Sequence, residues 1–77
     1  MNLKQLEAFV NVAEKRSFSK AARELYLTQP TVSAHVSALE KELNIKLFLR
    51  NTREVGLTDE GEKLYQYARQ MLNLRKR

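Results

Sequence analysis

A chain of 77 residues supports one small domain. Its formal net charge of +5 favours an anionic partner, with nucleic acid as the first candidate and an acidic membrane surface as the second. Without cysteine it has no disulfide framework and no thiolate zinc site, and it contains neither a signal-peptide core nor an apolar run near the roughly 20 residues that span a bilayer. A single histidine and no paired carboxylates on a pocket scaffold argue against an enzyme and against a cofactor, so we expect a cytoplasmic binding domain with no membrane partner.

The first two expected elements are helices of the core. Over residues 3–15, apolar side chains recur at helical spacing: Leu3, Leu6, Phe9, Val10 and Ala13. After a break at residues 17–19, we expect Ser19 to cap a short helix over residues 20–26, with Phe18 packing beside it as a hydrophobic staple. Ala21, Ala22 and Leu25 give that helix a small contact face, which suits the close crossing of a helix-turn-helix.

A third helix is expected over residues 29–43. Thr28 can cap it, Pro30 fits its first turn, and Asn44 suits a left-handed residue at its end. Spacings of 4, 3 and 4 place four apolar side chains on one face: Val32, Val36, Leu39 and Leu43. This face should pack on the core.

The opposite face of the third helix is small and nearly uncharged. It contains Pro30, Ala34, Ser37, Ala38 and Lys41, flanked by Thr31 and Ser33. No charged residue occurs between Leu25 and Leu39, although such residues make up 30% of the chain. Small side chains permit close approach, and hydroxyl groups and the Gln29 amide can bond to phosphates and base edges. The face therefore suits docking onto DNA, and a helix buried on both sides is the alternative.

Residues 45–57 predict a β-hairpin with strands over 45–50 and 55–57. Leu47, Phe48 and Leu57 should anchor it to the helices, because a lone hairpin is marginal in water. Its edge is cationic through Lys46, Arg50 and Arg53, which fits a minor groove or phosphates. An ordinary solvated loop with two arginines is the alternative.

Residues 59–77 predict a long helix that begins after Thr58, acidic at its start and basic at its end. A stripe at 3-4-3-4 spacing runs through Gly61, Leu64, Ala68, Met71 and Arg75, with Tyr65 and Leu72 beside it. One small domain cannot easily bury so long a stripe, so we hypothesise a homodimer. The expected dimerisation residues are Leu64, Tyr65, Ala68, Met71 and Leu72.

The chain stops in mid-helix, so we expect a domain over residues 1–58 and a linker helix over residues 59–77, cut from a longer regulator.

The segments SFSKAA, TQPTVS, LEKEL, LF and LTDEG occur in an order and spacing that resemble the N-terminal DNA-binding domain of LysR-type transcriptional regulators, over essentially the whole chain. The resemblance implies a mainly α winged helix-turn-helix, with a three-helix core, a two-stranded hairpin wing and a long linker helix that dimerises. It implies sequence-specific binding of double-stranded DNA for transcription regulation, with two recognition helices in successive major grooves of an interrupted palindrome. The wing, about 46–57, would lie at the adjacent minor groove or backbone. A small-molecule co-inducer is expected only for a C-terminal domain that this sequence lacks.

The resemblance also implies positions for the DNA contacts. They fall on Gln29, Pro30, Thr31, Ser33, Ala34 and Ser37 in the recognition helix and on Arg53 in the wing. The cationic edge of the hairpin adds Arg50 as an expected DNA contact. His35 lies near the edge of the apolar stripe and is expected as a partly buried neighbour or a phosphate donor. Many relatives carry Arg or Lys at position 34, so Ala34 leaves at most a methyl contact such as thymine offers.

Rival hypotheses stay open at this point. A winged helix of another regulator family would rarely place a linker helix straight after the wing. A protein-interaction module without nucleic acid would receive a partner helix on the small-residue face, and its binding would depend weakly on salt. An enzyme is a distant third, which would require a bound metal or an activity that falls when His35 is replaced.

Overall fold

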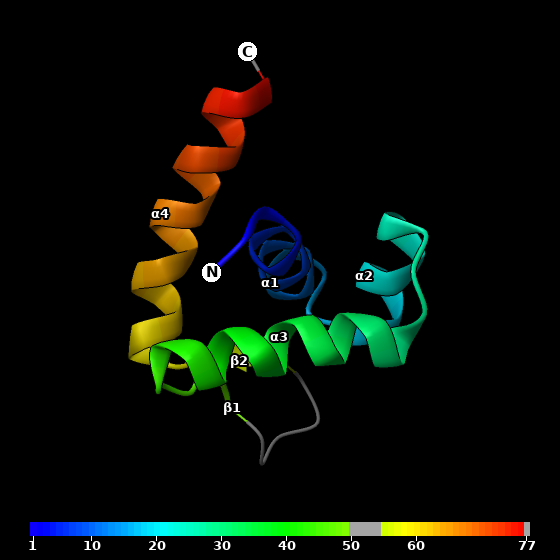
Figure 1. Ribbon diagram of the computed structural model, residues 1–77, viewed down its shortest axis with the longest axis horizontal. Helices are drawn as coiled ribbons and strands as arrows, with labels where there is room; N and C mark the ends of the chain where they lie inside the picture. Colours follow the sequence, from blue (N-terminus) through cyan, green and yellow to red (C-terminus); the bar gives the residue numbers. More distant parts are fainter. Residues whose placement is uncertain (50–54, 77) are drawn as a thin grey trace.

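The computed structural model describes residues 1–49 and 55–76, with side chains described for residues 1–49 and 55–73. The elements are α1 (Leu3–Lys15), α2 (Phe18–Leu25), α3 (Gln29–Leu43), β1 (Phe48–Leu49), β2 (Gly56–Leu57) and α4 (Asp59–Lys76). Helix α3 crosses below α1, α2 lies beside the N-terminal end of α3, and α4 rises away from its other end (Figure 1). This is the predicted winged helix-turn-helix followed by a long helix.

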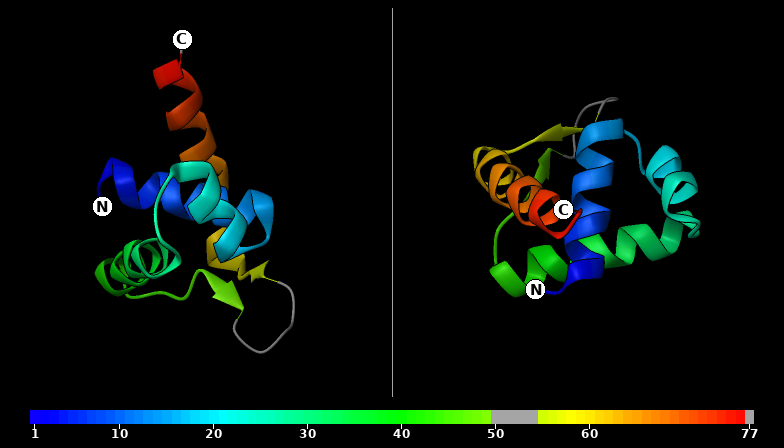
Figure 2. Two further views of the ribbon diagram at one scale, coloured as in Figure 1. Left: turned by 90° about the vertical axis from the view of Figure 1, so that its right-hand side faces the viewer. Right: turned by 90° about the horizontal axis from the view of Figure 1, so that it is seen from above.

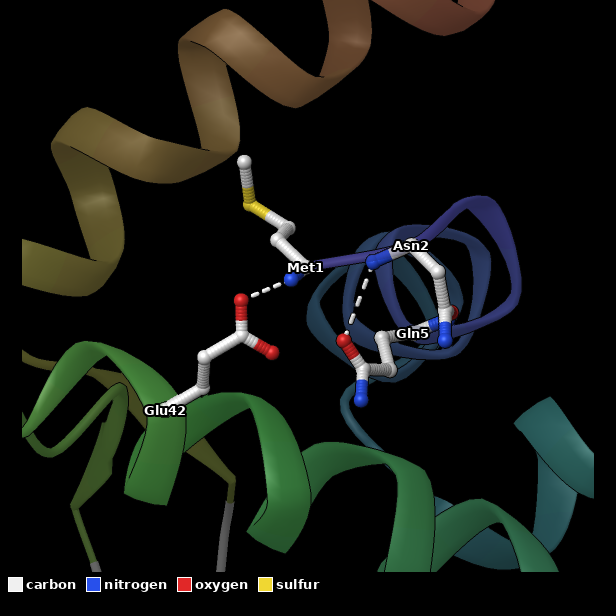
Figure 3. Close-up of polar contacts among 4 residues, drawn as sticks. All are labelled: Met1, Asn2, Gln5 and Glu42. Carbon is white, nitrogen blue, oxygen red and sulfur yellow. Dashed lines mark hydrogen bonds and ion pairs between the residues drawn. The ribbon is translucent and has the colours of Figure 1, made fainter.

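Local capping sets the bounds of α1 and α3. The Asn2 side chain accepts from the Gln5 N–H at 2.8 Å, and the Gln5 side chain accepts from the Asn2 N–H at 3.1 Å, which forms a capping box (Figure 3). Thr28 caps α3 as predicted, because its Oγ1 accepts from the Thr31 N–H at 3.3 Å. Asn44 ends α3 in the left-handed region, with φ of 56°.

The predicted start of α2 is wrong by two residues. Ser17, not Ser19, caps the helix, and its Oγ accepts from the Lys20 N–H at 3.1 Å. A start at Ser17 makes Phe18 the first residue of α2 and directs its ring against Phe48, with centroids 5.9 Å apart. The helix also ends one residue early, because Tyr26 adopts a left-handed conformation with φ of 57°.

Helix α1 lies at the centre of the core and packs against α2, α3 and α4. Phe9, on α1, is fully buried, and its ring lies 5.5 Å from that of Phe48 at the start of β1. The largest fully buried side chains are Phe9, Phe48, Leu39, Leu47, Val12, Val32 and Val36. With the buried residues of α2 and α4 included, the core joins all four helices to the base of the hairpin.

Within residues 45–49 and 55–57, which the structure describes, the strands are shorter than predicted, since only Phe48–Leu49 and Gly56–Leu57 are paired. Phe48 pairs with Leu57 and Leu49 pairs with Gly56 in an antiparallel register. Pairing does not extend to Leu47, because its N–H donates to the Glu40 carboxylate at 2.8 Å and its carbonyl accepts from the Thr58 N–H at 3.0 Å. The anchoring role of Leu47 and Phe48 is confirmed, since both are buried, and Leu57 packs on the core with part of its surface exposed.

Helix α4 is capped by Thr58 as predicted, with the Gly61 N–H donating to Thr58 Oγ1 at 3.0 Å. Its apolar stripe is not the open seam that the spacing suggests. Ala68 is completely buried and Leu72 is 9% exposed, because both lie in the core of their own chain, where α4 packs on α1. None of the helices in the described part of the chain combines the length and apolar character needed to cross a membrane.

Candidate nucleic-acid interface

Helix α3 is buried on one side only. Val32, Val36 and Leu39 are fully buried against the core. The outer face of α3 comprises the exposed residues Gln29, Pro30, Ala34, Ser37, Ala38 and Lys41. Thr31 and Ser33 lie half-buried on its flanks, as the helical spacing predicts. The alternative of a helix buried on both sides is therefore wrong for this chain.

Hydrogen bonds fix the polar groups at the N-terminal end of this face. The hydroxyls of Thr28 and Thr31 are bonded to each other at 2.8 Å. Ser19 donates to Gln29 Oε1 at 2.9 Å, which links the first turns of α2 and α3. Since the oxygen of the Gln29 amide accepts from Ser19, its nitrogen can donate to a base edge or a phosphate. The first turn of α3 is thus held in place before any partner binds.

The C-terminal half of α3 borders a hollow of about 410 Å³. It lies between α3 and the loop that follows, and its lining includes Ser37, Lys41, Asn44 and Lys46. Lys41 and Lys46 are exposed, so two ammonium groups stand beside the uncharged stretch of α3. A surface with hydroxyl and amide donors along its length and cations at one end suits a phosphate backbone.

The hairpin presents to the same side of the molecule as α3. In the left view of Figure 2, α3 and the two strands lie together below α1. The expected wing contacts Arg50 and Arg53 lie outside the described residues, so their roles stay predictions. The structure thus brings together the six expected DNA-contacting positions of α3 and places the base of the wing on the same side of the molecule.

His35 is half-buried at the edge of the outer face, which agrees with the predicted partly buried neighbour. Among the described residues, no group of three or more His, Asp or Glu side chains could hold a metal ion. The outer face offers hydrogen-bond donors and acceptors, small apolar surfaces and the ammonium group of Lys41.

Sequence reasoning missed one residue of this region. Glu40, on α3, is only 5% exposed, and its Oε2 accepts from the N–H of Leu47 at 2.8 Å and of Phe48 at 3.4 Å. The signal was available in the spacing, because Glu40 continues the buried positions Val32 and Val36 at intervals of four residues. A carboxylate on an apolar stripe indicates a buried partner with free backbone donors.

Comparison with known proteins agrees with this geometry. Residues 3–62 match the model of a family described as bacterial regulatory helix-turn-helix protein, lysR family. The chain belongs to the LysR family. The similar curated proteins include the uncharacterized HTH-type transcriptional regulator YxjO of Bacillus subtilis, 50% identical over 74 residues, and the regulator BenM of Acinetobacter baylyi, 45% identical over 73 residues. These matches cover 96% and 95% of this chain but 25% and 24% of the relatives, so the chain spans about a quarter of their length.

Solved structures of BenM share the fold along nearly the whole chain. The complex of the BenM DNA-binding domain with catB site 1 DNA superposes with a TM-score of 0.95 at 43% identity, covering 99% of this chain and 84% of that one. Full-length BenM superposes with a TM-score of 0.92 at 43% identity, covering 99% of this chain and 25% of that one. The winged helix-turn-helix and the long helix after it are therefore LysR-family features, and the hypothesis of another regulator family is wrong.

Proposed function

We propose that this chain binds double-stranded DNA sequence-specifically in transcription regulation, with α3 in the major groove and the wing at the adjacent minor groove. The outer face of α3 carries the proposal, because it is exposed, small and free of carboxylates while the opposite face, with Val32, Val36 and Leu39, is buried. The likeness to the BenM DNA-binding domain, which was solved in complex with catB site 1 DNA, supports this proposal.

The contacting residues follow from their places on α3 and in the wing. Gln29, Thr31, Ser33 and Ser37 donate or accept hydrogen bonds at bases and phosphates, and the proposed apolar contacts come from Pro30 and Ala34. The proposed wing cations are Arg50 and Arg53. We propose a binding domain rather than an enzyme.

We also propose a dimer that binds an interrupted palindrome. Two copies joined through α4 would place two α3 helices in successive major grooves. Residues 1–58 would form the DNA-binding unit and residues 59–77 the linker helix, with a co-inducer bound by a further domain of a longer protein. A regulator of this kind has to reach the chromosome, which is consistent with a cytoplasmic location.

The test is a fluorescence-anisotropy titration of the chain with mixed-sequence duplexes at two salt concentrations. A domain that contacts about 6–10 phosphates should lose on the order of 10³–10⁵ in affinity between roughly 50 and 200 mM salt. Affinity that depends weakly on salt, or no binding by folded protein, would favour the protein-interaction module instead. Sequencing the bound duplexes would give the half-site and its spacing.

Ser33→Glu tests whether the outer face of α3 meets the DNA. We expect this variant to abolish binding, because the new carboxylate would face phosphates. Gln66→Glu is the matched control, since it adds the same charge at an exposed position of α4. Equal affinities of the two variants would exclude α3 as the docking helix.

A further inference from the structure

The backbone of Leu47 is held from two sides, by Glu40 on α3 and by Thr58, which caps α4. Its N–H donates to the buried carboxylate of Glu40 on α3 at 2.8 Å, and its carbonyl accepts from the N–H of Thr58 at 3.0 Å. The Thr58 hydroxyl also donates to the carbonyl of Lys46 at 2.5 Å, directly before α4. One short segment therefore joins the recognition helix, the wing and the long helix.

The next residue along the chain, Phe48, makes the same link from the side of the hairpin. Its N–H donates to Glu40 at 3.4 Å, and it begins β1. Its ring is buried against Phe9 and Phe18, so this end of the strand cannot shift without disturbing the core. A carboxylate that accepts from two consecutive backbone N–H groups fixes both the distance and the direction of that backbone.

We propose that Glu40 is a positioning residue that sets the angle between α3 and the wing, and so decides which bases the wing reads once α3 is in its groove. Glu40 does not contact the DNA in this scheme. It acts through Leu47 and Phe48, whose positions carry β1. The inference rests on the proposed DNA binding and adds a determinant of specificity to it.

Glu40→Gln is the decisive variant, and Glu42→Gln is its matched control. Both remove one carboxylate from the last turns of α3, but Glu42 is exposed and pairs with the terminal ammonium of Met1 (Figure 3). Each variant is used to select from a randomised duplex pool, and base preferences are compared position by position. The duplex positions that α3 reads are identified as those at which the base preference changes in the variant Ala34→Lys.

We expect Glu40→Gln to lower the preference at positions flanking the α3 site about fivefold or more, the size of one lost base contact, while preference within that site is retained. Glu42→Gln should keep the base preferences both within the α3 site and at the flanking positions. A purely structural role would weaken binding evenly at all positions. Even weakening, or flanking preferences like those of the original chain, would overturn the inference.

Amide NMR spectra give a readout that does not need DNA. The Leu47 and Phe48 amides should shift and exchange faster with solvent in Glu40→Gln but not in Glu42→Gln, and unchanged amides would overturn the inference. If neither Glu40→Gln nor Glu40→Asp folds, Glu40 is a core residue and not a positioning residue. Should the original chain bind no DNA, the proposed function fails, and the amides still report whether Glu40 holds the wing.

Discussion

Gly61 lies where the first turn of α4 passes the carbonyl of Leu47. A Cβ at position 61 would stand 2.2 Å from that oxygen, which real contacts do not allow. Helix propensity favours Gly61→Ala by about 1 kcal/mol, but the overlap involves backbone that Thr58 and Glu40 hold in place. We expect a net loss of about 1–3 kcal/mol in unfolding free energy, measured by urea denaturation. Gly56→Ala is the control, because its Cβ would meet only a Leu49 methyl at 3.4 Å.

Tyr26 has a strained backbone and almost no side-chain contact. Its φ is 57° and its side chain is 96% exposed. Asn tolerates the left-handed region better than an aromatic residue, so Tyr26→Asn should raise the unfolding free energy by about 0.5–1 kcal/mol. Tyr67→Asn is the comparison, since Tyr67 is an exposed residue of a regular helix and should gain nothing. A stability gain shared by both variants would contradict the strain explanation.

At the scale of single residues, the sequence predicts the helix caps that depend on residues close by in the chain. Thr28, Asn44 and Thr58 cap helices as their types and positions suggest. Ser17 and Ser19 are both good caps, and the choice between them depends on Phe48, which is about thirty residues away and packs on Phe18. The spacing of four residues marks Glu40 as buried, but its partners Leu47 and Phe48 follow α3 along a path that the local pattern does not define.

At the scale of elements, the contact between α1 and α4 includes a polar clamp. The Tyr65 hydroxyl donates to Glu14 Oε2 at 3.1 Å, and the Arg69 guanidinium lies 3.8 Å from the same oxygen and 5.8 Å from the Tyr65 ring centroid. Burial, and then the bond to Glu14, raises the pKa of Tyr65 above its ordinary value of 10.0. The neutral phenol is therefore favoured in the folded state.

This clamp predicts a loss of stability in alkaline solution. Because the folded-state pKa of Tyr65 is raised, its contribution is fully present below pH 10.0 and is lost as the pH rises through the folded pKa. Tyr65→Phe should lose less stability than the original chain between about pH 9 and 11, measured by urea unfolding. Tyr67→Phe, on the exposed side of α4, should lose as much as the original chain. Equal losses in all three proteins would exclude the clamp as the cause.

Element types and order follow from the sequence, but the extent of the hairpin does not. Helical periodicity and caps give α1, α3 and α4, since these signals are local. The strands are shorter than their apolar composition suggests, because the hydrogen bonds of Leu47 go to Glu40 and Thr58 instead of a strand. In the interface, periodicity gives the outer face of α3, whereas the wing contacts at Arg50 and Arg53 stay predictions.

At the scale of the whole molecule, α4 has one face packed on its own chain and one exposed face that we propose for a partner. Ala68 is fully buried in the core, where α4 packs on α1, whereas Met71 is 43% and Tyr67 67% exposed. Leu64 and Tyr65 lie between, partly buried. The 3-4 spacing detects an apolar stripe but cannot show which side α1 covers. The predicted dimerisation residues Ala68 and Leu72 are buried in the core of their own chain, and we propose that the exposed Tyr67 joins Met71 in the contact between copies.

Met71→Glu and Ala68→Glu separate these two roles. Met71→Glu should leave the chain folded but shift it from dimer to monomer in sedimentation equilibrium, because a carboxylate would enter the apolar contact between copies. Ala68→Glu should unfold the chain instead, because the carboxylate would be buried in the core without a partner. A monomer reads one half-site, so Met71→Glu should also lose on the order of 10²–10⁴ in affinity for a palindrome while keeping its affinity for a single half-site. A folded Met71→Glu dimer would place the contact between copies elsewhere on the chain.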